Sequence, residues 1–162
     1  MSQPAPEVEQ KNAGVVVPPP LIYAGVLVFA LAMDALLGGP SIGLDGTPRM
    51  IAGGVLLAVG FAIPLIASAQ FKMAGTEVRP WKPSTALVTT GVYRFTRNPM
   101  YLGLTLIYAG IALLADSVIT LLCLVPLLAV IHYGVIKREE HYLEIIFGES
   151  YREYKRRVRR WI

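Results

Sequence analysis

The sequence predicts an all-α integral membrane protein with about four transmembrane helices. Its 162 residues are 54% hydrophobic and only 16% charged, whereas soluble domains carry roughly a quarter charged residues. The apolar residues gather in four runs of roughly bilayer-spanning length, and nearly all the basic residues gather in two blocks that adjoin these runs. Positive charge distributed in this way is typical of the cytoplasmic face of membrane proteins. An ordinary soluble domain is therefore excluded.

Residues 1–20 are polar and end in three consecutive prolines, which predicts a disordered or polyproline-like tail. We expect the rest of the chain, residues 21–162, to form a single transmembrane domain. Its first span should cover residues 21–37, which as a helix reach about 25 Å and cross a slightly thinned bilayer. Residues 38–48 are rich in glycine and proline and predict a short loop on the far side of the membrane.

The second span is expected over residues 50–69. Three of its glycines allow close approach of a neighbouring helix, namely Gly53, Gly54 and Gly60. Residues 70–98 are more polar and charged, so they predict a long cytoplasmic loop. Loops of this length are usually functional or disordered.

Asn98-Pro99 predicts the start of a helix, with Asn98 as the N-cap and the proline in the first turn. This third span should cover residues 99–115 and form a hairpin with a fourth span over residues 118–136. A charged, helical C-terminal tail follows, and Gly148 predicts a break within it. Four spans place both termini on the basic, cytoplasmic side. In a bacterium the protein would lie in the inner, cytoplasmic membrane.

Residue types that several reaction classes require are scarce. The chain has one cysteine and two histidines and lacks the HExxH and CxxC patterns, so no metal site is expected. A glycine-rich phosphate-binding fingerprint is absent from the sequence. The net charge of +4 does not indicate nucleic-acid binding, because the basic residues adjoin the apolar runs, as they do on the cytoplasmic side of membrane proteins. The remaining polar residues converge on the long loop, the start of the third span and an acidic pair after the fourth.

These residues suit a zwitterionic, cationic nucleotide. The N-terminus of the third helix and Arg97 favour a carboxylate or phosphate. Tyr93 and Tyr101 offer ring faces to a cation or a purine. Glu139 and Glu140 emerge at the same membrane face and suit an ammonium group or a pair of ribose hydroxyls. Simpler interpretations are a helix cap with an interfacial arginine, interface aromatics, and glutamates that balance the neighbouring basic residues.

Three sequence motifs follow one another along the chain, and together they indicate a protein family more specifically than any one of them alone. They are LVTTGVY at residues 87–93, RNPMYLG at residues 97–103, and Glu139-Glu140 followed by FGESYREY at residues 147–154. With these blocks, the chain from about Phe71 to Ile162 resembles the integral-membrane isoprenylcysteine carboxyl methyltransferases and their phospholipid N-methyltransferase relatives.

The resemblance implies S-adenosyl-L-methionine as methyl donor and a lipophilic small-molecule or lipid-linked acceptor that arrives from the bilayer. A glutamate of the Glu139-Glu140 pair would hold the polar end of the donor. Asn98-Pro99 stands where the isoprenylcysteine enzymes have histidine-proline, as in the phospholipid relatives. The residues that the resemblance places against the cofactor are Leu87, Val88, Gly91, Tyr93, Asn98, Pro99, Met100 and Tyr101.

Arg97, His132 and Glu139 are the candidates for direct roles in methyl transfer. His132 precedes Glu139 on nearly the same helix face, so it is a candidate base for an amine or thiol acceptor. The alternative is a structural histidine that is hydrogen-bonded to a neighbouring helix. The isoprenylcysteine enzymes carry an arginine about one turn before the functional glutamate, whereas Val135 and Ile136 stand here. The acceptor is therefore left open between carboxylate, amine and thiol.

Two other functions are consistent with the same sequence. One is a membrane reductase of the sterol-reductase type, which would bind NADPH instead of S-adenosyl-L-methionine. The other is a non-catalytic lipid-binding membrane protein, in which the polar residues have structural roles only. The sequence does not determine the oligomeric state.

Overall fold

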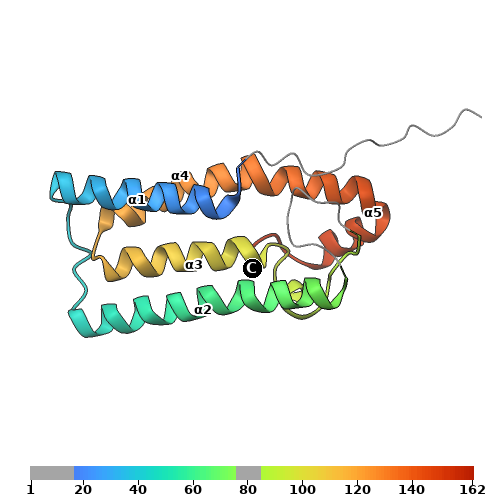
Figure 1. Cartoon of the computed structure of the whole chain (residues 1–162), viewed down its shortest axis with the longest axis horizontal. Helices are drawn as coiled ribbons and strands as arrows, with labels where there is room; N and C mark the ends of the chain where they lie inside the picture. Colours follow the sequence, from blue (N-terminus) through green and yellow to red (C-terminus); the bar gives the residue numbers. More distant parts are fainter. Residues whose placement is uncertain (1–16, 76–84) are drawn as a thin grey trace, which may run out of the picture.

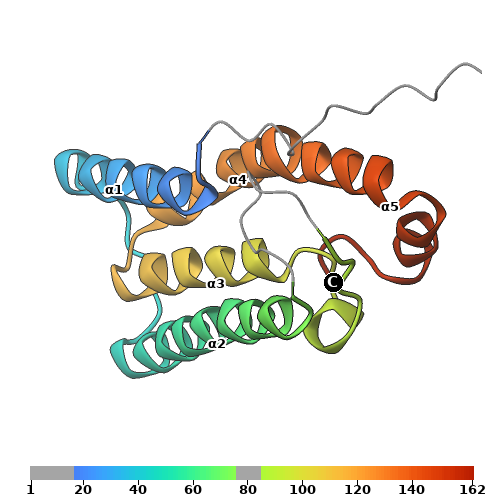
Figure 2. The same cartoon turned by 45° about the vertical axis from the view of Figure 1, so that its right-hand side comes forward.

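The structure is a computed structural model that describes residues 17–75 and 85–162, and its regular elements in these ranges are all helical. Most of the predicted tail at residues 1–20 and the middle of the predicted loop lie outside the described residues. Four long helices form an elongated bundle (Figure 1): α1 (Pro19–Leu37), α2 (Gly46–Met73), α3 (Pro99–Leu114) and α4 (Val118–Ile131). In Figure 2, α3 lies between α2 on one side and the pair α1 and α4 on the other.

The helices have the length and surface of a membrane protein. α1, α2 and the helical stretch Val118–Arg157 are each long and apolar enough to cross a bilayer, and α3 is apolar but shorter, with 16 residues. Large apolar side chains point away from the bundle, for example Val28, Leu65 and Val125, which are each more than half exposed. Because water solvates such a continuous apolar surface poorly, lipid must cover it. The predicted all-α membrane fold is confirmed.

α2 is longer at both ends than the predicted span over residues 50–69. Pro48 stands in its first turn, where the N–H that proline lacks has no helical partner anyway. The last turn is followed by Gly75, whose φ of +66° suits glycine and ends the helix. The glycine- and proline-rich loop before α2 is therefore shorter than predicted, and the loop after α2 begins later than predicted.

α2 and α3 approach each other through two pairs of glycines. A Cβ added at Gly60 would lie 2.9 Å from the carbonyl oxygen of Gly103, and one added at Gly110 would lie 2.9 Å from that of Gly53. In each pair the backbones are so close that a side chain does not fit. A Cβ at Gly54 meets nothing within 4 Å. Gly53 and Gly60 therefore mediate close packing as predicted, and Gly54 does not.

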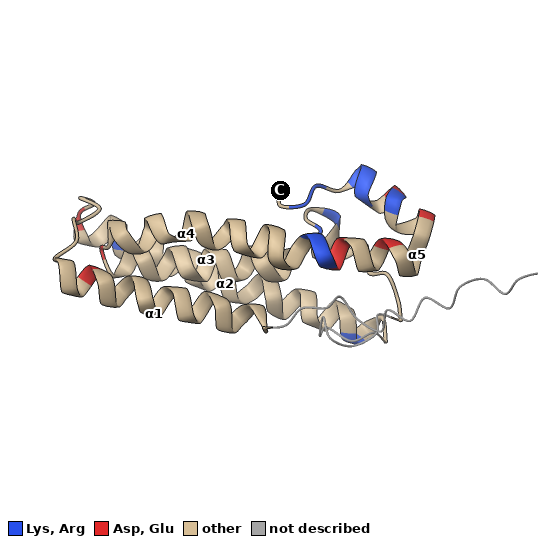
Figure 3. Ribbon diagram, turned by 90° about the horizontal axis from the view of Figure 1, so that it is seen from above, with Lys and Arg blue, Asp and Glu red and all other residues tan. Residues whose placement is uncertain are grey.

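The fourth span continues into the charged tail without a break. One turn of π-helix, η2 (His132–Ile136), joins α4 to α5 (Lys137–Arg157). Such turns interrupt the regular register of a helix and are frequent at functional sites. Gly148, with φ 53° and ψ −125°, breaks α5 as predicted, and the second half of α5 turns back toward the bundle (Figure 2). Most of the charged residues gather at this end of the molecule (Figure 3).

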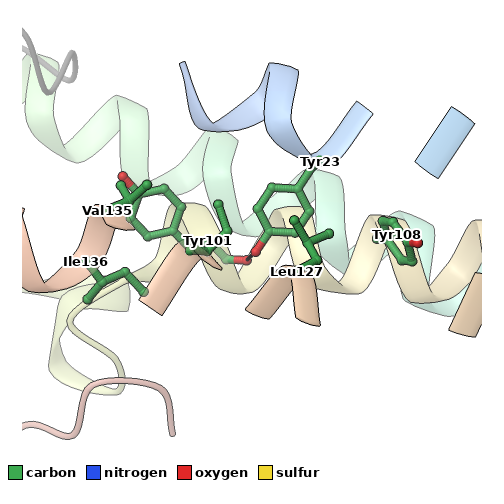
Figure 4. Packing of buried hydrophobic residues seen from close by; sticks show 7 residues of the cluster. Tyr23, Tyr101, Tyr108, Leu127, Val135 and Ile136 are labelled. Atoms are coloured by element: carbon green, nitrogen blue, oxygen red, sulfur yellow. Dashed lines mark hydrogen bonds between the residues drawn. The ribbon is translucent and has the colours of Figure 1, made fainter. Parts of the chain in front are cut away.

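A core of apolar and tyrosine side chains joins α1, α3, α4 and η2. Tyr101 and Tyr108 stand on α3, and the hydroxyl of Tyr23 from α1 lies 2.9 Å from Thr105 Oγ1. Figure 4 shows the cluster running along α3 from Tyr108 to Tyr101. Its buried members are Tyr23, Tyr101, Tyr108, Leu127, Ile131, Val135 and Ile136. The core of the bundle thus extends to the charged end.

Replacing Gly103 by alanine should destabilise this bundle. The new Cβ would overlap the ring of Pro64 and lie 2.7 Å from the carbonyl oxygen of Gly60, so α2 and α3 would have to move apart. We expect a loss of about 1–3 kcal/mol, measured as a lower midpoint of thermal unfolding in detergent. The matched control is Gly54→Ala, whose added methyl meets no neighbour. An equal loss in both variants would contradict the glycine packing.

Candidate functional site

The charged end of the bundle brings together three segments that are distant in sequence. The short 3-10 helix η1 (Gly91–Arg94) leads into α3, and the C-terminal segment, residues 158–162, crosses the start of α3 (Figure 1). The start of α5 contacts α3 through Glu139 and Tyr101. The backbone N–H of Arg97 donates to the carbonyl oxygen of Arg159 at 3.0 Å. The C-terminal segment is therefore part of the site.

Asn98 occupies the predicted N-cap position of α3, but its side chain makes no capping hydrogen bond. Its Nδ2 donates instead to the carbonyl oxygen of Arg160 at 2.9 Å, and Thr96 Oγ1 donates to the same oxygen at 3.1 Å. Pro99 follows as the first helical residue and is buried. The start of the helix was predicted correctly. The predicted capping hydrogen bond is wrong, because the hydrogen bond from Nδ2 to the C-terminal segment holds the amide in another orientation.

Glu140 is a buried carboxylate held by two arginines. Arg160 contacts both of its oxygens, with Nε 2.9 Å from Oε1 and Nη2 2.6 Å from Oε2. Arg97 Nη2 lies 3.1 Å from Oε1, and the side chains of Arg97 and Glu140 are only 8% and 7% exposed. Charge-assisted, two-point contacts of this kind are strong and directional. Both carboxylate oxygens are therefore engaged within the protein.

Glu139 is the member of the acidic pair that has no cationic partner in the described part of the chain. The hydroxyl of Tyr101 donates to its Oε1 at 2.6 Å. Burial raises the pKa of Glu139 to about 7, the hydrogen bond from Tyr101 opposes this rise, and the charge of Glu140 adds to it. The Glu139 carboxyl therefore changes its charge near neutral pH. A cation bound beside it would favour the ionised form.

Arg97 keeps unused hydrogen-bonding capacity. Among the residues that the structure describes, its Nε and Nη1 are buried without a hydrogen-bond partner, although Nη2 contacts Glu140. A buried donor without an acceptor costs free energy. A ligand carboxylate or another acceptor bound beside Arg97 would remove this cost.

A second cluster of buried side chains supports η1 against α2 and α5. The ring of Tyr93 packs edge-on against Phe71 with 5.3 Å between centroids, and its carbonyl oxygen accepts from the hydroxyl of Tyr154 at 2.8 Å. Burial raises the pKa of Tyr93 and of Tyr154, so both hydroxyls stay neutral. Four residues predicted to line the cofactor lie together in this cluster, namely Leu87, Val88, Tyr93 and Met100. The Tyr93 ring is 5% exposed and serves mainly in this packing.

Gly91 allows the chain to turn into η1 with a φ of +60°. A Cβ at this position would overlap the side chain of Gln70 on α2. With its amide nitrogen toward Thr90, Gln70 donates to the Thr90 carbonyl oxygen at 3.2 Å and accepts from the Val92 N–H at 3.3 Å. Gln70 thus anchors η1, a role that no local sequence signal indicates.

His132 stands at the start of η2, and its Nε2 lies 3.1 Å from Nη1 of Arg160. A guanidinium group only donates hydrogen bonds, so Nε2 must accept this one. The neutral ring then carries its proton on Nδ1 and has no free lone pair. A role for His132 as a base stays a prediction, and it requires Arg160 to move away first.

A pocket of about 380 Å³ opens between α3, α4, η2 and the C-terminal segment. This volume lies within the range of small-molecule sites. Thr105 lies one helical turn after Tyr101, so the pocket adjoins the Tyr101–Glu139 pair on the side of the membrane. The lining residues are Thr105, Leu128, Ala129, His132, Tyr133 and Trp161.

Fold and site together define a helical membrane protein with a polar site at one end of its bundle and an apolar pocket beside that site. The chain belongs to the phospholipid methyltransferase family, whose sequence profile matches residues 48–150. The family resemblance seen in the sequence is confirmed, and the match indicates a membrane methyltransferase.

Two relatives are similar to parts of the chain. An uncharacterized protein of Haemophilus influenzae is 43% identical over 63 residues, which make up 39% of this chain and 100% of that protein. The protein-S-isoprenylcysteine O-methyltransferase of Schizosaccharomyces pombe is 33% identical over 72 residues, which make up 44% of this chain and 30% of the yeast protein. No solved structure matches the chain.

The raised pKa of Glu139 should make the stability of the protein depend on pH. Because the folded state binds this proton more tightly than the unfolded chain does, stability should fall as the pH rises from about 4.5 to about 7. Glu139→Gln, which does not titrate, should exceed the wild type by roughly 1–3 kcal/mol at pH 8 and match it near pH 4.5. Thermal unfolding across this range measures the difference. Glu153→Gln, an exposed change on α5, is the control, and parallel curves for wild type and Glu139→Gln would contradict the assignment.

Proposed function

We propose that the protein transfers a methyl group from S-adenosyl-L-methionine to a small lipophilic acceptor at the cytoplasmic face of the membrane. The observation that carries the proposal is the family match, because residues 48–150 include both Tyr101 and Glu139. The likeness to the yeast O-methyltransferase supports it over the shared segment. The acceptor group is a carboxylate, an amine or a thiol.

The residues at the charged end fit S-adenosyl-L-methionine, which has a carboxylate, an ammonium group and ribose hydroxyls. Arg97, with two buried nitrogens that lack an acceptor, suits the carboxylate. Glu139 suits the ammonium group or the ribose hydroxyls, because no cation in the described ranges neutralises it. When bound, the donor supplies a methyl group on a positively charged sulfur. Residues of the second cluster suit its apolar parts, namely Leu87, Val88 and Met100.

Methyl transfer is an in-line displacement, so the protein mainly aligns the two reactants and excludes water. The hydroxyl of Tyr101 fixes the orientation of the Glu139 carboxyl. The contacts of Glu140 with Arg97 and Arg160 hold the C-terminal segment across the start of α3, which covers this side of the site. His132 would serve as a base for an amine or thiol acceptor only after Arg160 releases its ring.

The proposed topology separates the routes of the two reactants. The basic residues gather at the end of the bundle that carries α5, so we place this end and both termini in the cytoplasm (Figure 3). The water-soluble donor would enter from there, and the acceptor would enter from the bilayer. In a bacterium this is the inner membrane.

Binding of the donor tests the proposal directly. Calorimetry on the purified protein in detergent should show binding of S-adenosyl-L-methionine and S-adenosylhomocysteine. Affinity for S-adenosyl-L-methionine should rise between pH 6 and pH 8, because Glu139 ionises near pH 7 and its carboxylate then attracts the ammonium group. Glu139→Gln should weaken binding about tenfold and remove this pH dependence.

Glu153→Gln serves as the matched control for binding, because it removes an exposed carboxylate of α5 and should leave affinity unchanged. The absence of heat with both ligands would overturn the proposal. Binding of NADPH in their place would support a reductase instead.

A further inference from the structure

Two segments that are distant in sequence lie side by side at the start of α3. The backbone N–H of Arg97 donates to the carbonyl oxygen of Arg159 at 3.0 Å, and the hydroxyl of Tyr154 donates to that of Tyr93 at 2.8 Å. The end of α5 and the C-terminal segment therefore run beside η1 and the residues that follow it. The exposed basic and large apolar side chains of residues 93–98 and 157–162 form one surface, here called the arginine patch: Arg94, Phe95, Arg157, Arg159 and Ile162.

The arginine patch lies at the depth of the lipid head groups. The 16 residues of α3 rise about 24 Å, which is less than the thickness of the hydrocarbon core of a bilayer, about 30 Å. The start of α3 at Pro99 therefore lies at the edge of this core, and Phe95 stands only a few residues before it. Arg159 is held at the same level by its hydrogen bond with Arg97. This is where the apolar surface of the bundle ends and the charged end begins (Figure 3).

The apolar members of the patch are placed for contact with lipid. Phe95 is 75% exposed and Ile162 is 76% exposed. Large apolar side chains in water are unfavourable, whereas in the interfacial region of a bilayer they contact the upper parts of the acyl chains. Arginine next to phenylalanine is a combination typical of surfaces that bind in this region. The composition of the patch therefore indicates lipid as its neighbour.

The three arginines of the patch carry charge that the protein itself does not neutralise. Arg94, Arg157 and Arg159 have no acidic partner in the ranges that the structure describes, and Glu153, an exposed acid of α5, pairs with none of them. The other cations of these two segments and of the second half of α5 are paired with acids, namely Arg97 and Arg160 with Glu140, and Arg152, Lys155 and Arg156 with Glu144 and Glu149. Guanidinium groups contact phosphate oxygens at two points, so this surplus of positive charge suits a phosphate group.

We propose that the arginine patch is a binding site for anionic phospholipids, which it prefers over zwitterionic ones. Its arginines contact the phosphate of the lipid, and Phe95 and Ile162 contact the upper parts of the acyl chains. A zwitterionic lipid has the same phosphate, but its own ammonium group cancels the charge, so the net charge of the lipid gives the preference. The site is separate from the pocket between α3 and α4 and does not depend on methyl transfer.

A lipid bound to the patch also stabilises the C-terminal segment. Arg159 contributes its exposed side chain to the patch, while its carbonyl oxygen accepts from Arg97. The next residue, Arg160, is held by Glu140. An anionic lipid therefore strengthens the placement of residues 158–162 across the start of α3. Because the unfolded chain lacks this site, binding raises the free energy of unfolding.

Thermal unfolding of the full chain in dodecyl maltoside tests the preference. Dioctanoyl phosphatidylglycerol at about ten times its dissociation constant should raise the midpoint of unfolding by about 4 °C. Dioctanoyl phosphatidylcholine has the same acyl chains and a zwitterionic head group, and at equal concentration it should raise the midpoint by less than about 1 °C. Equal shifts with the two lipids would overturn the proposal.

Substitutions locate the site on the protein. Arg94→Gln and Arg159→Gln should each weaken binding of phosphatidylglycerol about fivefold. The matched control is Arg156→Gln, which removes the same charge, but from a guanidinium group that lies 2.9 Å from Glu149, and affinity should stay within about twofold. Native mass spectrometry counts the lipids retained by the folded protein, so it reports the preference even where a variant is less stable. Equal losses in all three variants would show that total charge attracts the lipid, and the patch assignment would fail.

The apolar contribution distinguishes a lipid from other phosphate-bearing ligands. Phe95→Ser should weaken binding of phosphatidylglycerol about tenfold, whereas Phe95→Leu should retain it. Inorganic phosphate and a short single-stranded RNA bring phosphate groups without acyl chains, and neither should raise the midpoint of unfolding as the anionic lipid does. Unchanged lipid binding in Phe95→Ser, or a shift with phosphate or RNA as large as that with phosphatidylglycerol, would contradict a lipid site.

Discussion

The carboxylate of Glu140, shared by Arg97 and Arg160, is the contact on which the charged end of the structure depends. It joins the loop before α3, the start of α5 and the C-terminal segment, which are far apart in the sequence. Ion pairs of this kind add little net stability compared with apolar packing, but losing one partner leaves a buried charge uncompensated. Their main effect here is positional, because they hold the backbone of residues 158–162 where Asn98 binds it and where Trp161 reaches the pocket.

Glu140 is occupied in this way, whereas its neighbour Glu139 has no cationic partner in the described part of the chain. Successive residues on a helix point about 100° apart, so Glu140 faces the two arginines while Glu139 faces Tyr101. One acid is neutralised by guanidinium groups and the other is tuned by burial toward neutral pH. Two identical side chains thus acquire different chemistry from their environments alone. The sequence indicated that the pair matters without distinguishing its members.

Features with a local cause could be predicted, and those that depend on distant contacts could not. The apolar runs, the proline at the start of α3 and the break at Gly148 each act within a few residues, and each prediction is confirmed. The π-helical turn at η2, the anchoring of η1 by Gln70 and the positions of Arg160 and Trp161 arise from contacts between distant segments. The amide of Asn98 shows the limit most directly, since its Nδ2 donates to the carbonyl oxygen of Arg160, 62 residues away, and its side chain makes no capping hydrogen bond.

The closely packed side of the bundle and the side that holds the pocket lie on opposite sides of α3. On the α2 side, paired glycines bring the backbones together and leave no room for a ligand. On the α4 side, larger side chains and the π-helical turn leave the pocket open between Thr105 and His132. Tyr101 lies where these two regions meet the charged end, with its ring in the apolar core and its hydroxyl on Glu139. The apolar core and the charged end of the bundle therefore meet at this one residue.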